Sequence, residues 1–154
     1  MRVPGIAWWP GRIRAGIASQ AVASTLDLLP TILSIAGIDP PRDRILDGRD
    51  ISGVLFGAVQ GEERTIHFYR GSRLMAIRKG PWKAHFITQP GYGGDPPESH
   101  DPPLLFHLER DPSERFDVAK AHPDVVADLA AEAARHRASF SPAPSQLEAR
   151  IPTR

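Results

Sequence analysis

Five polar side chains between residues 68 and 89 could together hold an anion. They are Tyr69, Arg70, Lys79, Lys83 and His85. Cationic and hydroxyl groups of this kind neutralise a bound negative charge and donate hydrogen bonds to it. The alternative is that they form the solvated face of a small sheet, because one face of an antiparallel sheet commonly meets water. On residue types alone, the solvated face is the simpler interpretation.

The other reactive side chains lack the spacing that common catalytic and metal sites require. The six histidines include no closely paired ligands such as His-x-x-x-His. Asp95, Glu98, His100 and Asp101 are close in sequence, but their spacing does not match a calcium-binding loop, and a solvated acidic loop accounts for them. No serine stands in a Gly-x-Ser-x-Gly elbow, and no cysteine is present to act as a nucleophile or ligand. The residues therefore predict no catalytic group and no metal site.

Tight turns divide the polar stretch into short strands. The ranges 65–69, 73–78 and 82–88 alternate or carry β-branched and aromatic residues, and glycine-containing turns separate them. In the third range, alternation places Lys83 and His85 on one face and the apolar residues around them on the other. A Gly- and Pro-rich loop is expected over 90–103 and a fourth strand over 104–108, which completes an antiparallel meander.

Helices and one further strand are expected on either side of the meander. The range 24–37 has an apolar stripe at helical spacing, with Ser24 or Thr25 as a cap and Gly37 at the end. A short helix is expected up to Phe56, and a long one over 123–138. The apolar run from Val3 to Trp9 fits a buried strand of a parallel sheet.

Composition excludes several classes of protein. The 154 residues carry 19 basic and 18 acidic side chains, a net charge of +1, so no global positive field favours nucleic acid. No apolar run reaches the roughly 18–20 residues that a membrane span needs. The first residues lack the apolar segment and cleavage site of a signal peptide.

Several phrases occur in the order found in the C-terminal third of the sulfatases. They are RVPGIAWWPGRI, ASTLDLLPTILSIAGI, LDGRDISGVLFG, FYRG followed by LMAIRKGPWKAHFIT, and HDPPLLFHLERDPSERFDVA. Each phrase is modest alone, but their order and spacing together are specific. The chain therefore resembles the sulfatase family, in particular its arylsulfatase A and N-acetylgalactosamine-6-sulfatase group, over the C-terminal portion only.

The resemblance implies an α/β fold of the alkaline-phosphatase-like kind. Residues 1–60 would be the C-terminal remnant of the large catalytic domain, with the run 3–9 as one strand of its sheet. Residues 61–140 would form the smaller C-terminal α+β subdomain, a four-stranded antiparallel sheet packed on a long helix. Residues 141–154 would form a proline-rich tail.

The resemblance also implies sulfate-ester hydrolysis, for which the family uses a formylglycine and a calcium ion. The formylglycine arises from the first residue of a Cys/Ser-x-Pro-x-Arg motif, and the calcium ligands include an Asp-Asn pair. This chain has no cysteine, no asparagine and no serine in that motif. We therefore expect neither cofactor in this chain, although the full-length family requires both.

What the resemblance carries over is the rim of the substrate pocket. In the family, the loop that matches His100-Asp101-Pro102-Pro103 approaches the mouth of the active site, which makes His100 the candidate for substrate contact. Lys83 and His85 lie in the matching phrase KAHF, either at the same rim or as structural residues of the meander.

Three hypotheses follow for the function. The chain could be part of a sulfatase, inactive alone, with Met1 an internal methionine and the N-terminal portion as its missing partner. It could instead be a stand-alone module that binds sulfated glycans or acts as a scaffold, or one subunit of a split sulfatase. A sulfated small molecule or glycan is the expected ligand, and exposure of the run 3–9 predicts self-association. The resemblance leaves the compartment open between periplasm, lysosome and secretion.

Overall fold

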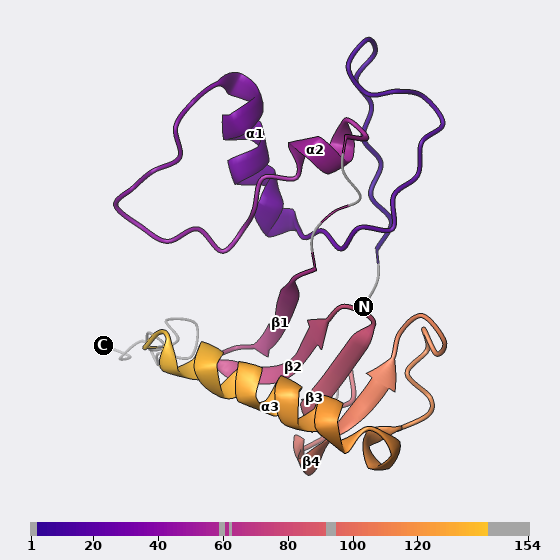
Figure 1. The fold of residues 1–154 in the computed structure, drawn as a ribbon. Helices are drawn as coiled ribbons and strands as arrows, with labels where there is room; N and C mark the ends of the chain where they lie inside the picture. Colours follow the sequence, from indigo (N-terminus) through magenta and orange to yellow (C-terminus); the bar gives the residue numbers. More distant parts are fainter. Residues whose placement is uncertain (1–2, 59–60, 62, 92–94, 142–154) are drawn as a thin grey trace, which may run out of the picture. The chain divides into compact units, whose positions relative to one another are not determined.

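The computed structural model of the chain describes residues 3–58, 61, 63–91 and 95–141. It divides into two compact units, residues 1–63 and 64–154 (Figure 1). Among the described residues, no helix is both long and apolar enough to cross a membrane. Apart from Ser141, the tail expected over 141–154 lies outside the described residues.

The second unit is an antiparallel four-stranded sheet with a helix on one face (Figure 1). The strands are β1 (Thr65–Arg70), β2 (Arg73–Lys79), β3 (Trp82–Thr88) and β4 (Glu98–His107), in the spatial order of the sequence. Two-residue turns that begin at glycines with positive φ join the first three strands, as the sequence predicts. The predicted meander of four strands is confirmed.

The long helix α3 (Pro123–Ala138) covers one face of this sheet and completes the core. Pro123 occupies the first turn, where its missing N–H costs little, and the last turn is basic. Val126, Leu129 and Ala133 of the helix pack against a buried group from the strands. That group consists of Leu74, Ile77, Ala84 and Leu105. The predicted helix and its packing on the sheet are confirmed.

The last strand begins earlier than the sequence indicates. Strand β4 starts at Glu98, so residues 98–103 of the loop expected over 90–103 belong to it. Pairing with β3 involves 98–99 and 104–107, and the register shifts between these two sections. Pro102 and Pro103 lie in the section between them, where no ladder hydrogen bond needs their missing N–H groups. The expected loop was therefore too long at its C-terminal end, because prolines are tolerated at an irregular edge strand.

In the first unit, a capping box begins the predicted helix. A 3-10 turn, η1 (Thr25–Asp27), leads into α1 (Leu28–Ala36), and Gly37 ends it with φ 68°. The Ser24 N–H donates to Asp27 Oδ2 at 2.7 Å, and Asp27 Oδ1 also accepts the Arg49 N–H at 2.9 Å. Asp27 is fully buried, so it ties the helix start to a segment 22 residues away.

The second short helix is α2 (Ser52–Leu55), shorter than expected. Asp50 Oδ1 accepts the Ser52 N–H at 2.8 Å, just before the helix starts.

The strand expected from Val3 to Trp9 does not form. These residues are irregular and exposed, and no described strand in this unit lies beside them to accept their backbone hydrogen bonds. An isolated strand leaves its backbone groups to water and gains nothing from the ladder, so the apolar run alone was an insufficient signal. Trp9 packs instead near Phe56, with ring centroids 6.2 Å apart, and Trp8 is 84% exposed.

Candidate functional site

Lys83 and His85 of β3 meet one carboxylate, that of Glu114. Lys83 Nζ donates to both carboxylate oxygens, at 2.7 and 3.0 Å. His85 Nε2 lies 2.6 Å from Glu114 Oε2. The two β3 residues are alternate, so they share the sheet face opposite the one that carries Ala84 and the core under α3. We name these three residues the Lys83–Glu114–His85 cluster.

Aromatic rings enclose the cluster on the sheet face. Lys83 Nζ lies 4.9 Å from the Phe68 ring centroid, and the Phe106 ring meets His85 edge-on at 5.6 Å. The Lys83 side chain is only 7% exposed, against about 20% for its two partners. The expectation of a solvated face is therefore wrong at Lys83, whose charge is buried and paired.

A tight loop after β4 brings Glu114 to this position. Asp111 Oδ2 accepts the N–H groups of Arg115 and Phe116, at 2.7 and 2.8 Å. Glu114 itself has φ 54°, a left-handed conformation that is uncommon outside glycine. Its N–H donates to the Asp111 carbonyl at 3.1 Å, which closes the turn. The loop is thus built to hold one carboxylate over the sheet.

Burial and charge shift two of the three groups. Burial lowers the pKa of His85, and the positive charge of Lys83 adds to this against the opposing effect of Glu114. Burial opposes ionisation of Glu114, but its hydrogen bonds to Lys83 and His85 outweigh that cost and lower the pKa of Glu114. At neutral pH a neutral His85 therefore donates its Nε2 proton to an ionised Glu114.

This geometry assigns the cluster a structural capability first. The donors of Lys83 face Glu114 and the Phe68 ring, so the arrangement joins the 108–117 loop to the sheet. Removing one partner of such a buried pair leaves an uncompensated charge, so the junction is sensitive to loss of either partner. The pocket-rim roles of Lys83 and His85 stay predictions.

His100 lies elsewhere in the unit. It belongs to β4, is half-buried, and its Nε2 is 2.8 Å from Thr88 Oγ1. It precedes the cis Asp101–Pro102 peptide, within the section of β4 that does not pair with β3. Among the described residues, His100 hydrogen-bonds neither Lys83 nor His85. Its contact with substrate stays a prediction.

The other polar residues of the opening stretch do not converge on the cluster. Lys79 forms an ion pair with Asp128 of α3 at 2.7 Å, and Tyr69 lies beside His136 and Phe140 at the end of that helix. Both therefore lie on the helix-covered face. Arg70 is exposed at the end of β1. The five groups do not form one anion site, because the pleat divides them between two faces.

Glu114 is the residue that sequence reasoning missed. Its only local signal was an acidic side chain following the Asp111-Pro112 turn. Such turns are common, and nothing local indicates which sheet residue the acid meets.

Comparisons with known proteins agree with the architecture. Residues 61–153 match the family model described as the C-terminal region of aryl-sulfatase. N-acetylgalactosamine-6-sulfatase from Canis lupus familiaris is 39% identical over 96% of this chain, and arylsulfatase A from Bos taurus is 38% identical over 86%. The PsFucS1 sulfatase from Pseudoalteromonas sp. superimposes with a TM-score of 0.74 at 25% identity, over 88% of this chain and 29% of that one.

The chain spans about a third of the length of the curated relatives it matches, 32% for the canine enzyme and 28% for the bovine one. The match to the family model covers the whole sheet and α3. The expected resemblance is confirmed: this chain belongs to the sulfatase family and corresponds to its C-terminal region.

Proposed function

We propose that this chain is the C-terminal part of a sulfatase that hydrolyses sulfate esters of sugars. The proposal rests on one observation: this chain aligns along 96% of its length with only 32% of an N-acetylgalactosamine-6-sulfatase. The sulfated sugar follows from the name of that relative and stays part of the proposal. In this role the chain supplies the C-terminal subdomain and part of the rim of the substrate pocket, where His100 contacts the substrate.

The residues present do not fit the cofactors of the family. No cysteine occurs, and no serine stands in a Cys/Ser-x-Pro-x-Arg motif that could become formylglycine. Within the described part of the chain, no group of three or more His, Cys, Asp or Glu residues could hold a metal ion. We therefore place the nucleophile and the calcium ligands on polypeptide outside these residues.

Exposed apolar surface on the first unit supports this division. Nine of its large apolar side chains are more than half exposed: Val3, Ile6, Trp8, Leu26, Leu28, Leu29, Ile32, Ile38 and Ile45. Contiguous exposed apolar surface commonly marks a protein interface. Further sulfatase polypeptide, the N-terminal portion, is the partner that would cover it.

A chimera tests the proposal. The C-terminal third of the canine N-acetylgalactosamine-6-sulfatase is replaced by this chain, and both the chimera and the isolated chain are assayed with an aryl sulfate and calcium. We expect turnover by the chimera and none by the chain alone. A folded chimera without turnover would show that this chain does not complete a sulfatase. Turnover by the purified chain alone would refute the proposal that the nucleophile and the calcium ligands lie on other polypeptide.

A further inference from the structure

A pocket on the second unit lies where three strand ends meet the last turn of α3. Its volume is about 360 Å³, within the range of small-ligand sites, at the lower end. It is lined by Tyr69, Ser72, Arg73, Leu74, Ile87, Arg137 and Phe140. None of the pocket-rim residues that the family resemblance implies, His100, Lys83 and His85, lines it.

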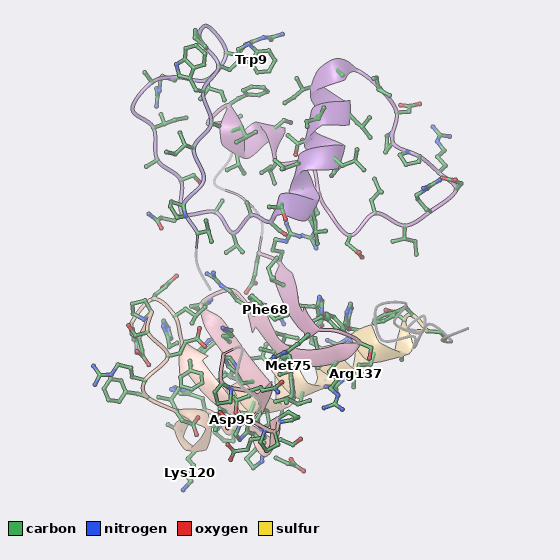
Figure 2. The ribbon with its side chains drawn as sticks, turned by 180° about the vertical axis from the view of Figure 1, so that it is seen from behind. Trp9, Phe68, Met75, Asp95, Lys120 and Arg137 are labelled. Atoms are coloured by element: carbon green, nitrogen blue, oxygen red, sulfur yellow. The ribbon has the colours of Figure 1, made fainter. Side chains whose placement is uncertain are left out.

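In the part of the chain that the structure describes, the two arginines of this pocket have no acidic partner. Among the described residues, Arg73 makes no side-chain hydrogen bond, ion pair or ring contact. Arg137, labelled in Figure 2, stacks its guanidinium carbon 5.2 Å from the Phe86 ring centroid and interacts electrostatically with Tyr69. None of the described lining residues is acidic. Guanidinium groups can bind a planar or tetrahedral oxyanion bidentately, and both of these line the same pocket.

The rest of the lining is aromatic and apolar. Tyr69 and Phe140 meet edge-on at 6.2 Å, and both are about 40% exposed, so their rings are available to a ligand. An aromatic face suits the C–H face of a pyranose ring, and the Tyr69 and Ser72 hydroxyls can hydrogen-bond its oxygens. The combination of rings and guanidinium groups fits a sugar that carries an anionic substituent better than a free ion.

The partial negative charge at the C-terminal end of α3 disfavours a bound anion, but the positive charges of the basic residues nearby exceed it. The last turn of α3 presents carbonyl groups with about half a negative charge. That same turn carries Arg135, His136 and Arg137, and Arg73 adds another full charge from β2. Arg135 is paired with Glu132, so Arg137 and Arg73 remain for a ligand.

We propose that this pocket binds a sulfated sugar unit through Arg73 and Arg137. The choice of sulfate over other anions rests on the proposed function. In a sulfatase of polymeric glycans, such a site would hold a neighbouring sulfated residue of the chain and raise the local concentration of substrate.

Binding to the intact 154-residue chain tests the inference without any need for turnover. N-acetylgalactosamine 6-sulfate is titrated while amide chemical shifts are recorded, with unsulfated N-acetylgalactosamine and sodium sulfate as parallel arms. We expect saturable chemical-shift changes at residues 69–74 and 136–140. The affinity for unsulfated N-acetylgalactosamine and for sodium sulfate should each be at least tenfold weaker. Saturation by sodium sulfate alone with equal affinity would indicate a general anion site and overturn the sugar assignment.

Arg73→Gln is the decisive variant, because Arg73 is exposed and, among the described residues, its side chain makes no hydrogen bond, ion pair or ring contact. It should weaken binding about tenfold, and Arg137→Gln should do the same. Arg110→Gln, an exposed arginine elsewhere in the unit, is the matched control and should leave binding unchanged. Unchanged affinity in Arg73→Gln would overturn the site. An active chimera without this binding would refute only the proposed pocket ligand, and binding without an active chimera would refute only the proposed function.

Discussion

Replacing Glu114 by glutamine should destabilise the second unit, because it leaves Lys83 as a buried cation without a carboxylate. The substitution keeps the size of the side chain and one oxygen acceptor. It removes the negative charge that faces Lys83 Nζ at 2.7 and 3.0 Å. It also removes the acceptor charge opposite His85.

The burial of the pair sets the magnitude. Breaking a buried ion pair on one side costs about 3–5 kcal/mol, against about 0–1 kcal/mol for an exposed one. Lys83 is 7% exposed and Glu114 is 21% exposed, so water reaches part of the pair. We therefore expect a loss of about 3 kcal/mol in the free energy of unfolding, at the lower end of the buried range.

A double-mutant cycle isolates the energy of the Lys83–Glu114 interaction from the other contacts of the two side chains. Lys83→Met keeps the apolar stem on Phe68 and leaves Glu114, the more exposed partner, hydrogen-bonded to His85, so it should cost less than Glu114→Gln. Combining the two should cost clearly less than the sum, with a coupling of about 1–3 kcal/mol. The reason is that the second substitution removes the charge that the first left unpaired.

Hydrogen exchange of the intact chain gives a reading specific to this unit. Amides of β3 and β4 report its opening, whereas Trp fluorescence would mix signals from both units. Glu132→Gln is the matched control, since its pair with Arg135 lies on the surface of α3 and should contribute no more than about 0.5 kcal/mol. Equal effects of Glu114→Gln and Glu132→Gln, or strictly additive effects in the double variant, would refute the reasoning.

Three further outcomes are expected. Folding lowers the pKa of both His85 and Glu114, so on acidification the unfolded chain binds protons at a higher pH than the folded chain does. The contribution of these two groups to stability is therefore complete above about pH 6.5 and should be lost as the pH falls, first through His85 and then through Glu114. Urea titrations at a series of pH values would show this loss. Gly48→Ala should lower the melting temperature of the first unit, because a Cβ there would lie 1.9 Å from the Leu26 carbonyl oxygen, and an unchanged melting curve would contradict this. Trp8→Gln should reduce self-association in light scattering, and a wild-type chain that is already monodisperse and monomeric would rule that association out.

Local sequence signals predicted the meander and the two principal helices because their causes are local. Turn glycines after Arg70 and Lys79 end the strands within one residue of the predicted positions. Ser24 and Gly37 mark the ends of the helical segment through hydrogen bonds to near neighbours. Binary alternation also predicted correctly which residues of β3 face α3.

The sequence by itself also determined the family, through the order of several modest phrases, and the absence of the nucleophile motif. Tertiary structure alone decided where the charges meet. Glu114 reaches Lys83 from 31 residues away. The contact requires Glu114 to take a left-handed backbone conformation in its turn. It also decided the start of β4 and the loss of the strand at 3–9, since a strand exists only where a neighbour accepts its hydrogen bonds, and no local pattern specifies that neighbour.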